Sequence, residues 1–334
     1  MSPRLRRSDC SGPGFSRRRA GRGFVYLDQG GKRITDQATL DRARALAIPP
    51  AWREVWSCRD AWGHLQATGV DDAGRKQYLY HARWRARRDR QKFDEMLKFA
   101  RTLPRLRRRV ARDIAGPELS WERVLAFAVR LLDIGLFRVG SDGYVEENGS
   151  HGLATLQREH TALDGARVIF DYPAKSAQRR VQSISDPHAV SVIRQLLRRR
   201  SGKRLLAFRE GRRWIEVRSD DINDYIKRHA AAEYSAKDFR TWNATVLAAL
   251  LCAERADRQP SQRAVSAVVK EVALVLGNTP AVSRASYIDP RVIDKFLAGT
   301  SIELSGLAAE SLITRPGGRA RERVEAAVVE LLDD

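Results

Sequence analysis

The spacing of apolar residues along the chain changes character near residue 85. Before it, apolar and polar residues alternate in short runs that turn residues separate, which is typical of antiparallel strands. These runs occupy residues 24–28, 53–59, 64–71 and 76–84. One helical pattern interrupts them, at 36–48, and it ends at Pro49-Pro50. The first part of the chain is therefore predicted to be a small, β-rich domain.

After residue 85 the apolar period becomes that of helices. The run 120–135 begins with Ser120 as an N-cap, and Gly135 stands where a C-cap is expected. Its apolar residues recur at helical spacing, at Trp121, Leu125, Val129 and Leu132. Further helices are predicted after Asp186, Ser219, Ser235 and Pro260.

Hairpins interrupt this helical region. Asp164-Gly165 lies between two strand-like runs in 158–172, and a second turn is predicted at 173–178. Residues 204–217 are predicted to form another hairpin. The pattern as a whole predicts an α+β protein, with a small antiparallel β-domain followed by a larger, mainly α-helical domain that carries a β-hairpin region.

Charge sets the expected boundaries. Residues 1–22 are rich in Arg, Gly and Ser, and we expect a disordered basic arm that either contacts phosphates or remains a solvated tail. The run RARRDRQKFDE at 85–95 is interpreted as a linker that enters a helix. The predicted domains are therefore 23–88, β-rich, and 89–334, mainly helical.

Composition narrows the class of partner. The 334 residues carry a formal net charge of +20, and 43% are hydrophobic, which is enough for a core. So large a charge favours nucleic acid as the partner, ahead of an anionic membrane surface. No apolar run reaches the ~18 residues of a membrane span, and the N-terminus has no secretory signal. We expect a cytoplasmic protein associated with the nucleoid.

Cofactor motifs are missing from the sequence. The three cysteines, Cys10, Cys58 and Cys252, form no Cys-x-x-Cys pair, and the histidines have no ligand spacing. No phosphate-binding loop of the GxxxxGK[ST] kind occurs. We therefore expect neither a metal nor a nucleotide cofactor.

Three cationic residues stand beside apolar segments. Arg138 follows an apolar helix, Lys175 is expected near the tip of a turn, and Arg240 lies in the first turns of a helix that Ser235 caps. Taken singly, each is more often a structural residue in an ion pair. Directed at one pocket, they would form a phosphate site, because Arg gives permanently charged, bidentate donors and Lys can deliver a proton.

Tyr287 lies at a helix break in GNTPAVSRASYIDP, residues 277–290. Thr279-Pro280 and Asp289-Pro290 are both helix-start signals, so a helix of about two turns should end near Tyr287. The tyrosine either caps a small hydrophobic core or acts as a nucleophile.

Five further segments follow one another along the chain: GHLQATGVDDAGRKQYLYH (63–81), FRVGSDGYVEENGSHGLATL (137–156), AKS around Lys175, AKDFRTW (236–242) and LGNTPAVSRASY (276–287). In this order they resemble the type IB DNA topoisomerases of bacteria and poxviruses. The resemblance implies an isomerase that relaxes supercoiled DNA through a 3′-phosphotyrosyl intermediate, without ATP or metal. It also implies a monomer that clamps duplex DNA between the two domains.

The resemblance assigns roles to individual residues. Tyr287 would be the nucleophile and Lys175 the general acid, while Arg138, Arg240 and Asn278 would stabilise the transition state. Some family members carry His in place of Asn278, and Asn cannot shuttle protons, so its role here would be electrostatic. Ala174 stands where the family is expected to have Gly. We also expect the segment 284–289 to be mobile without DNA, with Tyr287 lying away from the arginines.

DNA contacts are expected on both domains. Tyr78 and Tyr80 alternate with other residues of a predicted strand and share one face, which either packs a β-core or lies against DNA. The expected DNA-contact residues are Arg75, Lys76, Gln77, Tyr78, Tyr80, His81, Tyr144 and Lys237.

Two other functions compete with this interpretation. A tyrosine recombinase shares the Arg-Lys-Arg-Tyr set, but it usually has His three residues before the second arginine, where this chain has Lys237. A non-catalytic basic DNA-binding protein would have no need of Tyr287 or Lys175.

Overall fold

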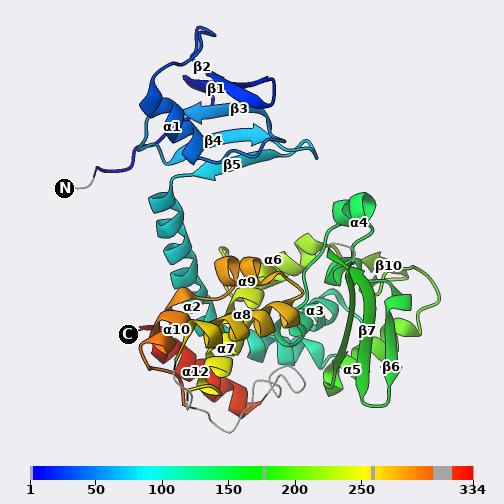
Figure 1. Cartoon of the computed structure of the whole chain (residues 1–334). Helices are drawn as coiled ribbons and strands as arrows, with labels where there is room; N and C mark the ends of the chain where they lie inside the picture. The colour runs from blue at the N-terminus through cyan, green and yellow to red at the C-terminus, as the bar shows by residue number, and fades with distance from the viewer. Residues whose placement is uncertain (1–2, 176–177, 257–259, 304–317, 334) are drawn as a thin grey trace. The chain divides into compact units, whose positions relative to one another are not determined.

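The chain divides into two compact units, Met1–Asp94 and Glu95–Asp334. Figure 1 shows the computed structural model, which describes residues 3–175, 178–256, 260–303 and 318–333. Helix α2 (Ala82–Ile114) runs through the boundary between the units. The charge run 85–95, expected to be a linker, is therefore helical. Arg, Lys, Gln and Glu are all good helix formers, so its charge is compatible with a helix.

The first unit is built on an antiparallel sheet in the order β2-β1-β3-β4-β5, as the sequence predicts for its β-domain. Ile48, Val55 and Ala67 form its apolar core, and Trp52 and Leu79 pack against them. The elements are β1 (Gly14–Ala20), β2 (Gly23–Leu27), α1 (Gln37–Ala45), β3 (Arg53–Cys58), β4 (Leu65–Val70) and β5 (Lys76–Tyr80).

Strand β1 corrects the expectation of a disordered arm at residues 1–22. Its backbone pairs with β2 on one side and with β3 on the other, so it lies inside the sheet. Arg17 donates to the carbonyls of Ile48, Pro49 and Trp52, and its guanidinium lies 4.1 Å from the ring centroid of Phe24. An arginine that appears in sequence to be solvated is thus a structural donor to a loop.

The second unit is mainly helical, with a three-stranded antiparallel sheet and a separate hairpin. Its elements after α2 are α3 (Trp121–Gly135), α4 (Asp142–Asn148), the 3-10 turns Leu153–Thr155 and Arg158–His160, β6 (Thr161–Asp164), β7 (Arg167–Ala174), β8 (Gln178–Ile184), α5 (Pro187–Leu197), β9 (Ala207–Glu210), β10 (Arg213–Glu216), α6 (Ser219–His229), α7 (Ala236–Ala253), α8 (Gln262–Leu276), α9 (Pro280–Ser286), α10 (Pro290–Leu297) and α12 (Arg319–Asp333). The predicted turn at 173–178 includes Ser176 and Ala177, which lie outside the described residues.

Helix α7 is the central helix of the second unit. Every residue from Phe239 to Ala253 is buried, and α7 packs against α3, α6, α8, α10 and α12. A helix that is apolar on all sides belongs in the interior. Arg240 therefore enters the protein interior because it lies on this helix, close to its N-terminus.

The end of α3 differs from the expected glycine cap. Leu136, not Gly135, adopts the left-handed conformation, with φ of 55°. Gly135 is required for close packing instead, since a Cβ there would lie 2.4 Å from the Phe137 ring. A non-glycine residue in this conformation is strained, and such strain concentrates at functional sites. The strained residue here lies two positions before Arg138.

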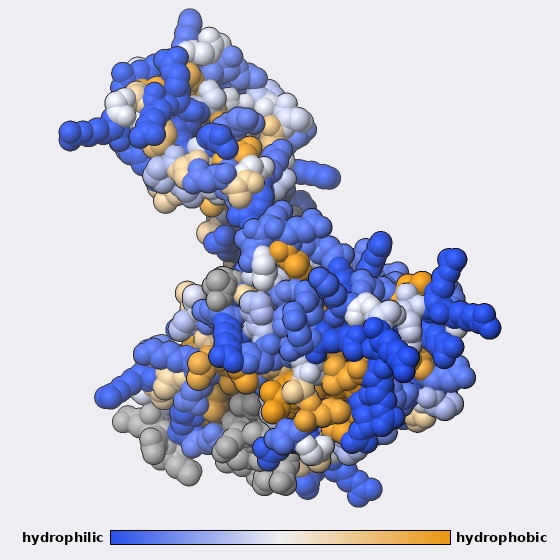
Figure 2. All heavy atoms as spheres, turned by 90° about the vertical axis from the view of Figure 1, so that its right-hand side faces the viewer, coloured by the Kyte–Doolittle hydropathy of each residue, from blue (hydrophilic) through white to orange (hydrophobic). Residues whose placement is uncertain are grey.

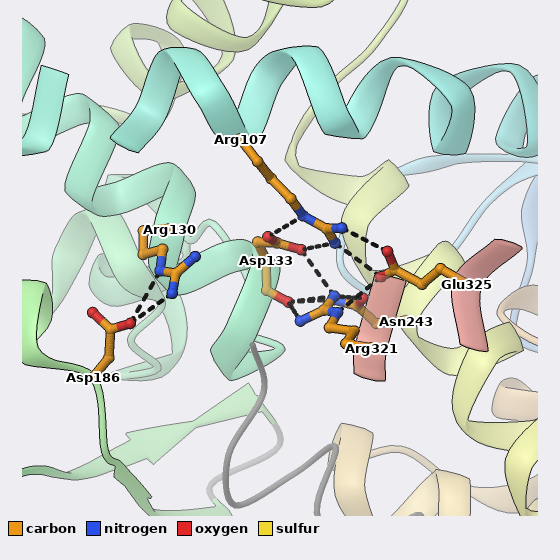
Figure 3. A network of polar contacts seen from close by, with 7 residues as sticks. All are labelled: Arg107, Arg130, Asp133, Asp186, Asn243, Arg321 and Glu325. Carbon is orange, nitrogen blue, oxygen red and sulfur yellow. Dashed lines mark hydrogen bonds and ion pairs between the residues drawn. The ribbon is translucent and has the colours of Figure 1, made fainter. Parts of the chain in front are cut away.

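A paired network of charges links α12 to the rest of the second unit (Figure 3). Arg107 of α2 donates to both oxygens of Asp133 on α3, at 2.8 and 2.9 Å, and also to Glu325 of α12. Arg321 of α12 donates to Asp133, to Glu325 and to Asn243 of α7, at 2.9, 2.8 and 2.7 Å. Two guanidiniums thus meet two carboxylates, so the buried charges balance.

The surface follows the charge of the chain. On the face shown in Figure 2, hydrophilic residues predominate in each unit, and the larger unit also presents an apolar area. Among the described residues no single helix is long and apolar enough to cross a membrane; α8 and α9 together meet that test of length and composition, with a bend of 95° between them. In the structure Val265, Val268 and Val272 of α8 are buried in the second unit, as in a core helix.

Candidate active site

Arg138 and Arg240 converge on the loop between α8 and α9. Arg138 donates to the carbonyl of Gly277 at 3.1 Å and to the side-chain oxygen of Asn278. Arg240 is buried and donates to the carbonyls of Leu276, at 2.9 Å, and of Leu136. All of these acceptors are neutral, so neither guanidinium is neutralised by them.

Tyr287 completes the group, at the break between helices that the sequence predicts. Thr279 caps the start of α9, Tyr287 is the C-cap residue of that helix, and Asp289 caps α10. The Tyr287 ring centroid lies 5.4 Å from Cζ of Arg240, and its phenol interacts with both Arg240 and Arg138. The expectation that Tyr287 lies away from the arginines is therefore wrong for this structure. Both guanidiniums reach the phenol oxygen, which accepts hydrogen bonds from them.

The guanidiniums act on the phenol electrostatically. Burial alone would raise the pKa of Tyr287, but the positive charges of Arg240 and Arg138 and their hydrogen bonds outweigh it, so the pKa lies below its usual value of 10. Burial, followed by the charge of Arg138, lowers the pKa of the Arg240 guanidinium to about 10. Burial thus disfavours the charged form of Arg240, while the arginines favour the charged form of Tyr287. Both shifts indicate that the site has more positive than negative charge.

A cavity of about 510 Å³ opens beside these residues. Arg138, Lys175 and Arg240 line it together, so the structure gathers the three cationic residues that the sequence analysis selected. Lys175 is exposed. Within the part of the chain that the structure describes, no Asp or Glu side chain lines this cavity. An anion that binds from outside the protein would balance the positive charges of Arg138, Lys175 and Arg240.

Two further cationic residues line the cavity, and neither was predicted from the sequence. Arg179 is exposed and pairs with Asp171, whereas the neighbouring Arg180 is partly buried and donates to neutral acceptors. Arg180 lies on β8, where Gln178, Arg180, Gln182 and Ile184 share one face because side chains alternate along a strand. The buried Ile184 at the end of this row shows that the face turns inward. The alternation of side chains along this strand is the sequence pattern from which the inward position of Arg180 could have been predicted.

Asn278 offers an unpaired donor. Its oxygen faces the Arg138 guanidinium, which can only donate, so its amide nitrogen must point elsewhere. That nitrogen is buried and has no acceptor among the described protein atoms. A buried donor without a partner is costly, and a phosphoryl oxygen would satisfy it.

The DNA-contact residues expected on the first unit fall on two faces of β5. Tyr78 and Tyr80 are exposed on one face, with ring centroids 6.2 Å apart, and Lys76 lies 5.9 Å from the Tyr78 centroid. Gln77 lies on the opposite face, where it donates to Asp71 at 2.8 Å. The alternative that the two tyrosines pack into a β-core does not hold in this structure.

The remaining expected DNA contacts are partly engaged within the protein. Arg75 also pairs with Asp71, at 3.0 Å. His81 accepts a hydrogen bond from the backbone of Arg83 at the start of α2. Tyr144 of α4 and Lys237 of α7, in the second unit, are exposed.

No group of three or more His, Cys, Asp or Glu side chains among the residues described is arranged to hold a metal ion. The site consists of a phenol, two arginines that contact it, and a cavity that these arginines line with other cations and, among the described residues, without an acid. Such a site suits an enzyme that acts on phosphodiesters, and the net charge of +20 suits a nucleic acid as their source.

Comparison with known proteins defines the family. Residues 81–299 match the catalytic core of eukaryotic DNA topoisomerase I, and residues 23–71 match the N-terminal domain of bacterial DNA topoisomerase IB. The chain is also similar to DNA topoisomerase 1B of Acanthamoeba polyphaga mimivirus, with 29% identity over 286 residues that span 82% of this chain and 85% of that protein.

The chain therefore belongs to the type IB DNA topoisomerases. It is an isomerase whose substrate is DNA, and the resemblance noted in the sequence is confirmed. The fold agrees as well, with an N-terminal antiparallel sheet and a larger helical part.

Proposed function

We propose that Tyr287 is the nucleophile with which this topoisomerase cleaves one DNA strand. The observation that carries the proposal is the position of its phenol against Arg138 and Arg240, beside a cavity without an acid among the described residues. The phenol loses its proton to solvent, the phenolate oxygen attacks a backbone phosphate to form an O–P bond, and the bond from phosphorus to the 5′-oxygen breaks. The products are a 3′-phosphotyrosyl link and a free 5′-hydroxyl.

The arginines act twice in this step. An unperturbed phenol is ionised in only about one molecule in a thousand at neutral pH, so a lowered pKa increases the nucleophilic fraction. As the phosphorus becomes five-coordinate, charge grows on its nonbridging oxygens, and Arg138 and Arg240 stabilise it. In this structure the two arginines donate to the backbone carbonyls of Gly277, Leu276 and Leu136. They exchange these acceptors for phosphoryl oxygens when the phosphate enters the site.

Asn278 and Lys175 complete the proposed site. The unpaired amide nitrogen of Asn278 donates to a phosphoryl oxygen, without moving a proton. Lys175, at the cavity, gives its proton to the departing 5′-oxygen and recovers it when the hydroxyl attacks in religation. The bond energy stays in the phosphotyrosine between the two steps, so the reaction draws on no nucleotide.

We further propose that the protein acts as a monomer that holds duplex DNA with both units. On the first unit, the exposed Tyr78 and Tyr80 with Lys76 offer an aromatic and basic face to the duplex. On the second unit, the exposed Tyr144 and Lys237 are candidates for backbone contacts. Because the protein carries a net charge of +20, cations should neutralise many DNA phosphates, so binding should weaken steeply as salt rises.

Plasmid relaxation with EDTA and without ATP tests the proposal. Wild type should relax supercoiled plasmid, and Tyr287→Phe should leave it supercoiled, because no other group forms the covalent link. The control is Tyr26→Phe, which removes a 3.4 Å hydrogen bond to the carbonyl of Ala43 and an interaction with Arg17, both in the first unit, and should relax plasmid normally. Mass spectrometry of the trapped adduct should place DNA on Tyr287. An adduct on another residue would refute the assignment.

A further inference from the structure

Arg180 has contacts that hold it in place without neutralising its charge. Its Nε donates to the side-chain oxygen of Gln182 at 2.8 Å, and its Nη2 donates to the carbonyl of Val275 at 2.9 Å. The first contact is within β8 and the second reaches the last turn of α8. Both acceptors are neutral, so the guanidinium is oriented but retains its charge.

Gly277 brings Arg180 close to Arg138. A Cβ at this position would lie 2.9 Å from Nη1 of Arg180, so a side chain here would displace the Arg180 guanidinium. The carbonyl of the same glycine accepts a hydrogen bond from Arg138 at 3.1 Å. Gly277 also has a φ of 62°, which favours glycine independently. The two guanidiniums thus approach one another around a residue without a side chain.

Among the residues that the structure describes, no carboxylate is found to offset the repulsion between Arg180 and Arg138. Burial lowers the pKa of Arg180, Tyr172 opposes that shift, and the charge of Arg138 lowers the pKa further. The neighbouring Arg179 is different, because it is exposed and pairs with Asp171 at 2.7 Å. Of these two consecutive arginines on β8, Arg179 has a carboxylate as its counter-ion. Arg180 has only neutral hydrogen-bond partners among the described residues.

We propose that Arg180 is a further catalytic residue, whose guanidinium donates to a nonbridging oxygen of the phosphate that Tyr287 attacks. This rests on the function proposed above for the same cavity. The role is electrostatic, since no bond to Arg180 forms or breaks and an arginine keeps its proton. The phosphate supplies the negative charge that Arg138, Arg180 and Arg240 lack together.

The test compares two DNA substrates in single-turnover cleavage. One carries the natural phosphodiester at the cleavage site, and the other carries a methylphosphonate there, which removes one charged nonbridging oxygen. Arg180→Gln should slow cleavage of the phosphodiester by about 100-fold, the usual loss for one such donor. One methylphosphonate stereoisomer lacks the oxygen that Arg180 contacts. On that substrate, Arg180→Gln and wild-type protein should cleave at nearly the same rate. An equal loss on both substrates and both stereoisomers would overturn the proposal.

Two further variants guard this comparison. The ratio of the two rates is taken within each protein, so it does not depend on the fraction that is folded. Arg180→Lys keeps a positive charge and should recover part of the rate on the phosphodiester. Arg179→Gln is the matched control on the same strand, and its ratio should equal that of wild type.

The two variants Arg180→Gln and Tyr287→Phe distinguish a failure of the role proposed for Arg180 from a failure of the role proposed for Tyr287. If Arg180→Gln behaves as wild type while Tyr287→Phe forms no adduct, only the role of Arg180 fails. If Tyr287→Phe still forms the adduct, the nucleophile is misassigned and the cavity is not the cleavage site.

Discussion

The second unit contains two groups of arginines that differ in one respect. Around Asp133, Arg107 and Arg321 share the carboxylates of Asp133 and Glu325. Around the cavity, the guanidiniums of Arg138, Arg180 and Arg240 donate to backbone carbonyls and amide oxygens, and among the residues described no acid lines the cavity. Both groups are largely shielded from water, yet only the first is balanced in charge.

The difference separates a structural use of arginine from a chemical one. In the balanced group, burial opposes ionisation of Asp133, but Arg107 and Arg321 more than compensate, and the pKa of that carboxyl is lowered. Its charge is fully used inside the protein. In the unbalanced group, the positive charges of Arg240 and Arg138 stabilise the phenolate of Tyr287 and lower the pKa of its phenol. A phosphate is the ligand that would turn the second group into a balanced one.

Removing one carboxylate from the balanced group should have the largest effect. Asp133→Asn leaves Arg107 and Arg321 short of a negative charge, so the free energy of unfolding should fall by about 3–5 kcal/mol. Urea denaturation measures this change. Since Asp133 lies outside the cavity, the variant that remains folded should still cleave DNA.

An exposed pair provides the control for that variant. Asp171→Asn breaks the ion pair with the exposed Arg179, and it should lower the free energy of unfolding far less than Asp133→Asn, because water screens an exposed pair. Equal losses for Asp133→Asn and Asp171→Asn would mean that the balanced group contributes no more than a surface pair.

Removing one cation from the unbalanced group should have the opposite profile. Arg240→Gln should slow single-turnover cleavage by about 100- to 1000-fold, or about 2.7–4 kcal/mol in the barrier. Its free energy of unfolding should fall far less than that of Asp133→Asn, because relief of uncompensated charge offsets the lost hydrogen bonds to Leu136 and Leu276.

The matching control is Arg101→Gln, which removes an exposed pair with Asp333. It should cleave DNA at the wild-type rate. The comparison of the two groups would be wrong if Arg240→Gln lost as much stability as Asp133→Asn while cleaving DNA normally.

Much of this site could be predicted from sequence because its signals are local. Cap residues and proline fix the start of α9 and α10, so the break that carries Tyr287 is visible in Thr279-Pro280 and Asp289-Pro290. Arg138 and Arg240 stand out because apolar residues surround them. The strands of the first unit follow from alternation and turns, and four of them lie where the sequence predicts.

The rest depends on contacts between distant segments. The arginines of β1 resemble a solvated tail until the carbonyls of Ile48, Pro49 and Trp52 are in place. Arg180 differs from Arg179 only through its neighbours, Val275 and Gly277 in place of Asp171. The balance of charge around a buried arginine is a property of the fold, so no single segment reveals it.

The central claim is that the cations of the cavity are uncompensated and that Tyr287 experiences their charge. An NMR titration of protein labelled with ¹³C at tyrosine Cζ measures this directly, with Tyr287→Phe to assign the resonance. Burial alone would raise the pKa of the phenol, so a pKa below 10 requires the net positive charge. We expect a value below 10 in wild type and a higher one in Arg240→Gln. A wild-type pKa at or above 10, unchanged by Arg240→Gln, would contradict the account.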